Sequence, residues 1–195
     1  MNQPSTNAIA TGKAHANSLD EFIISPYNHE YNKAVTQLLN NAFGENRLKK
    51  SSYKLRETCK KIDSLSYVIL ADNTAKDIKI LASIEYWQLN VAGAKALLLG
   101  PLAVDPASQG LGLGRKIIED SLKLARELSA KNAWSFVILI GDLDYYAKCG
   151  FKRVPLAAID YPKPTDPNRI LYLEFKTGSL NKLIESSNLP LLLNQ

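Results

Sequence analysis

The chain has 195 residues, of which 46% are hydrophobic and 22% are charged. A chain of this length and composition can build one packed core, which excludes global disorder and favours a single folded domain. The net charge of +5 is local, because residues 46–61 carry seven Lys and Arg against one Glu and the remainder is close to neutral.

The first part of the chain predicts a strand followed by an amphipathic helix. Residues 1–20 are rich in Asn, Ser, Thr and Ala without any hydrophobic period, and we expect a mobile leader there. Residues 22–24 predict a short strand. Apolar residues at the spacing of one helix face then predict a helix over 31–43, with Asn28 as its N-cap and Gly44 as its stop.

A second helix and three strands are expected next. The basic residues predict a helix over 53–62, and β-branched and aromatic residues predict strands over 67–71, 78–89 and 96–104. Short polar links between these strands favour an antiparallel meander. Gly100-Pro101 interrupts the third strand, and because proline cannot donate to a β-ladder, we expect an edge or a bulge there.

The second half predicts a helix, a buried strand and a closing hairpin. Apolar residues at helical spacing predict a helix over 113–128, and the continuous apolar run 134–140 is typical of a strand covered on both faces. A short helix over 142–149 and strands over 151–154 and 170–175 follow.

The predicted element order is β-α-α-β-β-β-α-β-α-β-β. It describes an α+β fold with a mixed sheet, antiparallel at first, one right-handed parallel crossover in the middle and helices on both faces. Residues 21–176 are expected to form the domain, and 177–195 a helical or loose C-terminal extension.

The loop Gln109–Gly114, Gln-Gly-Leu-Gly-Leu-Gly, leads into the predicted central helix. A helix N-terminus carries unpaired amides and a partial positive charge, and glycines let its backbone approach an anion closely. Arg115 and Lys116 add charge, so the loop predicts a bound phosphate or pyrophosphate. The spacing fits neither the P-loop nor the dinucleotide-binding fingerprint.

Three segments together carry a family resemblance. Residues 99–106, the Q-x-x-G-x-G loop 109–114 and the Y-x-x-x-G-F ending Tyr146–Phe151 resemble the GNAT superfamily of acetyltransferases, most closely its predicted small bacterial members. The resemblance covers roughly residues 21–176, and the predicted element order agrees with it.

The resemblance implies an acetyl-CoA site. In the family, acetyl-CoA lies between the bulged strand and the next parallel strand, with its pantetheine arm along the first and its pyrophosphate in the loop. The residues that the resemblance implies for cofactor binding are Leu102, Ala103, Val104, Gln109, Gly110, Leu111, Gly112, Leu113, Gly114, Arg115 and Tyr146.

Acyl transfer from a thioester to an amine needs a proton donor for the leaving sulfur. Tyr146 matches the family position of this acid, and a tyrosine hydroxyl stays protonated at neutral pH; Tyr145 is its possible substitute. Glu85, on the strand before the bulged one, is the candidate general base. Asp142 and Asp144 are alternatives, and substrate binding could itself shed the proton of the amine.

The remaining reactive residues favour no other chemistry. Cys59 and Cys149 lie in no CxxC pair and near no histidine, and His15 and His29 are too few for a metal cluster, so we expect no metal. Cys149 is expected to pack in the core. The first 20 residues lack the apolar core of a signal peptide, and no apolar run approaches the ~20 residues of a membrane helix, so a cytoplasmic protein without membrane association is expected.

Three functions follow from these patterns. The leading hypothesis is an N-acetyltransferase that moves an acetyl group from acetyl-CoA to a primary amine, on a small molecule or a protein, by direct attack. The alternative is a CoA-binding sensor without turnover. Nucleic-acid binding through residues 46–61 is disfavoured, since Tyr53 is the only aromatic side chain there and such a run is usually a solvated helix face. A homodimer is compatible with the sequence.

Overall fold

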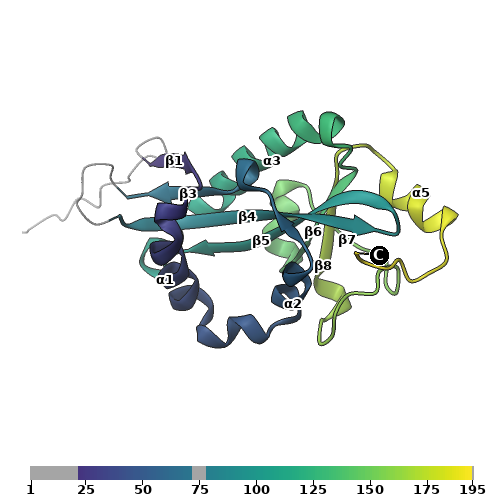
Figure 1. The fold of residues 1–195 in the computed structure, drawn as a ribbon, viewed down its shortest axis with the longest axis horizontal. Helices are drawn as coiled ribbons and strands as arrows, with labels where there is room; N and C mark the ends of the chain where they lie inside the picture. The colour runs from purple at the N-terminus through teal and green to yellow at the C-terminus, as the bar shows by residue number, and fades with distance from the viewer. Residues whose placement is uncertain (1–21, 72–77, 195) are drawn as a thin grey trace, which may run out of the picture.

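The computed structural model describes residues 22–71 and 78–194, so the expected leader 1–20 and the turn 72–77 lie outside the described residues. Eight strands form one mixed sheet in the order β1-β3-β4-β5-β6-β8-β7, with β2 paired to β4 (Figure 1). The strands are β1 Ile23–Pro26, β2 Lys60–Lys61, β3 Tyr67–Leu70, β4 Ile80–Val91, β5 Ala94–Val104, β6 Phe136–Ile140, β7 Lys152–Arg153 and β8 Ile170–Glu174.

The β5–β6 pair is parallel and the other strand pairs are antiparallel, which confirms the predicted meander and crossover. The described residues also form five α-helices and several 3-10 turns. The helices are α1 Asn32–Phe43, α2 Ser51–Glu57, α3 Leu113–Asn132, α4 Leu143–Tyr146 and α5 Ser179–Ser186. Among the described residues, none of the helices is long and apolar enough to cross a membrane.

Helices cover both faces of the sheet, because successive side chains of a strand point to opposite faces. On β5, Leu97 and Leu99 belong to the core under α3, whereas Leu98 belongs to the core shared with α2 and α5. The apolar side of α1 packs on the same face as α2, against β3, β4 and β5 (Figure 1). The mixed α+β layout predicted from periodicity is therefore confirmed.

Two irregularities of β5 shape the middle of the sheet. The pairs Ile84–Leu102 and Tyr86–Leu99 flank a register shift. Between these two pairs, β5 contains one residue more than β4, at Gly100-Pro101. This is the predicted bulge. The Trp87 indole N–H donates to Gly100 O at 2.8 Å and holds the bulge in place. Pairing of β5 with β6 ends at Leu98–Ile138, so the rest of β5 diverges from β6.

The basic helix differs from its prediction. The helix α2 ends at Glu57, and Lys60–Lys61 form β2 instead, because their backbone completes the edge of β4 beside Trp87 and Gln88. Nor are residues 46–61 one solvated face, since the Arg47 and Arg56 side chains are buried. At the preceding helix, Asn28 caps the 3-10 turn before α1 rather than α1 itself.

The C-terminal segment folds against the domain. The α5 side chain of Leu180 and the later Leu191 are fully buried. Leu191 forms a bridge with Ile159, and the Asp160 N–H donates to Leu191 O at 3.0 Å. The tail thereby holds the loop between β7 and β8 in position.

Candidate functional site

A cavity of about 840 Å³ opens where β5 diverges from β6. Along the diverging part of β5, the edge that faces away from β4 has no strand partner within the described part of the chain, so its amides and carbonyls can bond a ligand. Of the predicted cofactor residues, those that line the cavity are Leu102, Ala103, Val104, Gln109, Gly110, Gly112, Leu113, Gly114, Arg115 and Tyr146. Leu111 and Glu85 do not line it.

The glycine loop forms one wall of this cavity. Gly110 and Gly112 have positive φ of 84° and 78°, a conformation that costs other residues energy, and Gly112 stands immediately before α3. The Lys116 N–H donates to Gly112 O at 3.0 Å, so the amides of residues 113–115 have no carbonyl acceptor within the helix. The loop thus presents unpaired N–H groups and the positive end of a 20-residue helix to the cavity.

The two charged residues that follow the loop, Arg115 and Lys116, lie in the first turn of α3. Arg115 lines the cavity and is paired with Glu119 at 2.7 Å, and Lys116 is paired with Asp120 at 3.2 Å outside it. Both pairs are solvent-exposed, so they contribute little to stability and are easily exchanged for a ligand anion.

Tyr146, at the end of α4, also lines the cavity. Its ring packs edge-on against Tyr145 and Phe151, with centroids 5.0 and 5.7 Å away. A Cβ on Gly141, at the end of β6, would stand 2.2 Å from Tyr146 Cε2, so the ring position requires glycine there. Burial raises the pKa of Tyr146, which therefore remains protonated at neutral pH.

The candidate bases are placed differently. Glu85 lies opposite the bulge with its side chain largely buried, and its carboxylate is paired with Lys61 Nζ at 2.9 Å. Asp142 lines the cavity at the N-terminus of α4 and is paired with Arg169 at 3.3 Å. Both carboxylates are thus already engaged by a cation. Asp144 is exposed and does not line the cavity.

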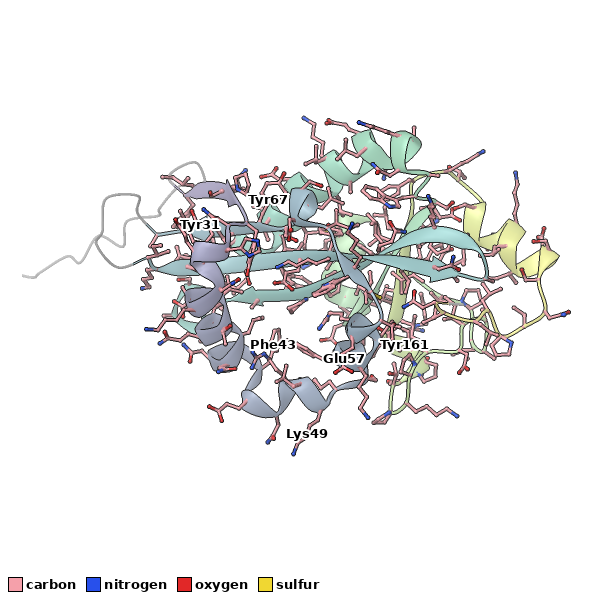
Figure 2. The ribbon with its side chains drawn as sticks, viewed as in Figure 1. Tyr31, Phe43, Lys49, Glu57, Tyr67 and Tyr161 are labelled. Atoms are coloured by element: carbon pink, nitrogen blue, oxygen red, sulfur yellow. The ribbon has the colours of Figure 1, made fainter. Side chains whose placement is uncertain are left out.

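A third group of lining residues was not predicted. Arg56 of α2 is 9% exposed, and its guanidinium lies over the Tyr53 ring, 4.4 Å from the centroid. Tyr161, in the loop between β7 and β8, and Phe43, at the end of α1, line the same cavity and lie on either side of the end of α2 in Figure 2. Nothing in the sequence distinguishes Arg56 from the neighbouring cations, since its burial depends on contacts between distant segments.

The cysteines offer no competing chemistry. Both are free and half-buried, and burial raises the pKa of the Cys149 thiol. A protonated thiol is a poor nucleophile, in agreement with the expected packing role. The described residues also bring together no group of three or more His, Cys, Asp or Glu side chains that could hold a metal ion.

Comparison with known proteins identifies the family of this chain. The model of the acetyltransferase (GNAT) family matches residues 32–151, more than half of the chain. The chain belongs to the acetyltransferase (GNAT) family. The predicted family and enzyme class are thereby confirmed, whereas no curated protein matches the chain.

Solved GNAT structures share the fold. An Escherichia coli GNAT family N-acetyltransferase in complex with CoA has a TM-score of 0.66 at 19% identity, with 88% of each chain covered. A Brucella melitensis GNAT family acetyltransferase in complex with acetyl-CoA has a TM-score of 0.54 at 23% identity, over 80% of this chain and 88% of that one. The Escherichia coli ribosomal-protein-S18-alanine N-acetyltransferase has a TM-score of 0.51 at 20% identity, over 80% of this chain and 95% of that one.

Proposed function

We propose that this GNAT protein transfers the acetyl group of acetyl-CoA to a primary amine, by direct attack of the amine while both substrates are bound. The observation that carries the proposal is the single cavity lined by the glycine loop, by the free edge of β5 and by Tyr146. Family membership supports the reaction class, and the ligands of the Escherichia coli and Brucella relatives support the cofactor.

The lining residues suit the parts of acetyl-CoA. The amides at the start of α3 and Arg115 would bind the pyrophosphate, because both supply positive charge and N–H donors. The unpaired edge of Leu102–Val104 would bind the amide groups of the pantetheine arm as an added strand does. The thioester would then lie near the bulge at Gly100-Pro101.

The chemistry required of the chain is limited, because acetyl-CoA supplies an activated thioester. A C–N bond to the amine forms, the C–S bond breaks, and coenzyme A leaves as the thiol. Tyr146 donates a hydrogen bond and then its proton to the leaving sulfur. Since burial raises the pKa of Tyr146, the hydroxyl is the protonated donor over the whole neutral range, and the proton moves as the C–S bond breaks.

The amine must lose a proton during the reaction. Glu85 as general base stays a prediction: its carboxylate is paired with Lys61 and lies outside the cavity lining, so a water molecule would have to relay the proton. Asp142 lines the cavity but is paired with Arg169. An amine that enters in its neutral form needs neither carboxylate to begin the attack; the proton that its nitrogen loses as the amide forms would then pass through water to Tyr146 and restore the hydroxyl.

The cofactor site is tested by calorimetric titration of the full chain with acetyl-CoA. We expect saturable binding, with coenzyme A competing for the same site. Absence of binding at millimolar acetyl-CoA would contradict the proposal at its first step.

Replacement of Tyr146 by Phe tests the proton donor. The ring and its packing are kept while the hydroxyl is lost, so kcat should fall roughly 100-fold, at the low end for general acid catalysis, with little change in the Kd of acetyl-CoA. Thiol release measures the first quantity and calorimetry the second. An unchanged kcat would mean that Tyr146 only packs against its neighbours and donates no proton.

A CoA-binding regulator without turnover is the second candidate. It is favoured by the absence of an unpaired carboxylate from the cavity lining, as far as the chain is described. Tight acetyl-CoA binding with no thiol release across a broad panel of amines would support it over the transferase.

A further inference from the structure

Buried hydrogen-bonding atoms without a partner gather at one end of the cavity. Within residues 22–71 and 78–194, six buried side-chain polar atoms lack a partner. Four of them belong to three residues that line the cavity: Arg56 Nε and Nη1, Tyr53 Oη and Tyr161 Oη. Folded proteins satisfy nearly all buried polar groups, so such a cluster in a cavity requires an explanation.

The cluster lies beside the bulge rather than beside the glycine loop. Arg56 Nη2 is 3.2 Å from the position that a Cβ on Gly100 would occupy. Gly100 lies four positions before the end of β5 at Val104, about 13 Å at ~3.3 Å per residue, and the glycine loop follows. A pyrophosphate in the loop therefore cannot also satisfy Arg56.

Among the described residues, no carboxylate is paired with Arg56. The charged side chains that line the whole cavity are Lys50, Arg56, Arg115, Arg169 and Asp142. Asp142 is already paired with Arg169, and nearby Glu85 with Lys61. A buried guanidinium without a carboxylate partner is costly, and an anion that enters the cavity would relieve that cost.

We infer that the acceptor amine carries an anionic group, a carboxylate or a phosphate, which binds to the Arg56 guanidinium and to the hydroxyls of Tyr53 and Tyr161. The inference rests on the proposed function and specifies its acceptor class. Amino acids and amino phosphates fit this site. Polyamines and aminoglycosides do not, since further positive charge would enter a cavity that is already cationic.

The two tyrosines are suited to donate. Burial raises the pKa of both Tyr53 and Tyr161, so each hydroxyl is protonated at neutral pH. A planar guanidinium with two hydroxyl donors can surround a carboxylate or phosphate with charge-assisted hydrogen bonds.

Contacts between distant segments hold the three donors together. Ser51 of α2 is hydrogen-bonded to Thr165 of the loop between β7 and β8, with 2.6 Å between their hydroxyl oxygens. The same loop, which carries Tyr161, is bound to the tail through Asp160 N–H and Leu191 O. The anion site is thus built from α2 and this loop and is independent of α3.

The experiment compares acceptors that differ only in the anionic group. Thiol release from acetyl-CoA is measured for L-amino acids against their carboxamides, for phosphoethanolamine against ethanolamine, and for spermidine. The quantity of interest is the kcat/KM ratio of the anionic to the neutral member of a pair. In Arg56→Gln this ratio should fall roughly 30-fold or more, as for loss of a buried charged partner, while the Kd of acetyl-CoA stays near the wild-type value.

Three further measurements keep the test decisive. Tyr161→Phe retains the ring and should lower the same ratio to a smaller extent. Arg126→Gln removes an exposed positive charge on α3 outside the cavity and should leave the ratio unchanged. Calorimetry of the chain saturated with coenzyme A should detect binding of the preferred anionic amine to the wild type and not to Arg56→Gln.

The outcomes separate the inference from the proposed function. Higher kcat/KM for spermidine or for the neutral members would overturn the anionic acceptor while leaving the transferase intact. An equal loss of kcat for all acceptors in Arg56→Gln would assign Arg56 to the transfer step and also overturn it. Failure to bind acetyl-CoA would contradict the proposed function and, with it, the assignment of an acceptor. Titration of the free protein with the same amines would then show separately whether Arg56 forms an anion site, since binding should be lost in Arg56→Gln.

Discussion

The contact between Gly141 and Tyr146 couples the end of β6 to the proposed proton donor. Because a Cβ at position 141 would overlap the Tyr146 ring, any larger residue must push the ring away from its place at the cavity. The hydroxyl would then be displaced from the sulfur by more than a hydrogen bond tolerates.

Gly141→Ala should therefore lower kcat with little effect on the Kd of acetyl-CoA. The control is the same substitution in a Tyr146→Phe background, where the hydroxyl is already absent and Gly141→Ala should add little to the loss. Additive losses in the double variant would show that Gly141 acts by some other route.

The identity of Tyr146 as a candidate is readable from the Y-x-x-x-G-F motif, but its partner Gly141 is not. The two residues are close in sequence, yet the need for glycine arises only because α4 folds back over the end of β6. The role of Arg56 is even harder to predict from the sequence, because nothing local shows which of the seven cations in residues 46–61 are buried.

At the scale of elements, the loop before α3 and the tail after β8 each position part of the site. The loop depends on left-handed backbone at Gly110 and Gly112. The tail depends on the burial of Leu180 and Leu191, which attach it to the domain.

Gly110→Ala should weaken acetyl-CoA binding roughly tenfold, because left-handed backbone costs about 1–2 kcal/mol outside glycine and the loop would relax away from it. Gly178→Ala is a matched control, because φ is 75° at Gly178 and 84° at Gly110, and a Cβ at either position would contact no neighbour. Gly178, however, precedes α5 instead of α3. Calorimetry should show a wild-type Kd for Gly178→Ala. Equal weakening in both variants would mean that general destabilisation, not the loop, is responsible.

Leu191→Ala should lower the free energy of unfolding by roughly 2–5 kcal/mol, as for a large-to-small change in a core. The neighbouring Leu192 is 39% exposed, so Leu192→Ala should cost far less. Urea unfolding followed by circular dichroism measures both values. Similar small losses in the two variants would mean that the tail does not pack in solution as it does here.

At the scale of the whole molecule, the described sheet and helices bury several tyrosines partly or completely. Burial raises the pKa of Tyr86, Tyr146 and Tyr161 above the usual ~10. Tyr86 is fully buried, and its hydroxyl is hydrogen-bonded to Ser121 at 2.9 Å. Each of these groups is therefore neutral in the folded protein at a pH where the unfolded chain would ionise it.

The consequence is a loss of stability at alkaline pH. A folded-state pKa above the unfolded value contributes stability that is complete below pH ~10 and decreases as the pH rises toward the folded pKa. The contribution of these tyrosines to the Tm should be nearly constant between pH 7 and about 9.5, and the Tm should fall steeply above about pH 10 in thermal unfolding experiments. In the folded state, tyrosinate absorbance should come only from the more accessible tyrosines, and the remaining increase should appear together with unfolding. Ionisation of all nine tyrosines before unfolding would contradict the burial of these three hydroxyls.

Local pattern by itself determined the mixed sheet, the crossover through α3, the bulge at Gly100-Pro101 and the glycine loop, because periodicity, proline and glycine act on neighbouring residues through the backbone. The local pattern wrongly predicted that the basic helix continues to residue 62, because the pairing of Lys60–Lys61 with β4 overrides their helical preference. Only the tertiary structure decided that Glu85 is paired with Lys61, that Arg56 is buried with Tyr53 and Tyr161, and that the tail supports the loop that carries Tyr161. These features depend on contacts between residues far apart in the chain. The ion pair, the buried cluster and the contact with the tail therefore exist only after those segments have packed.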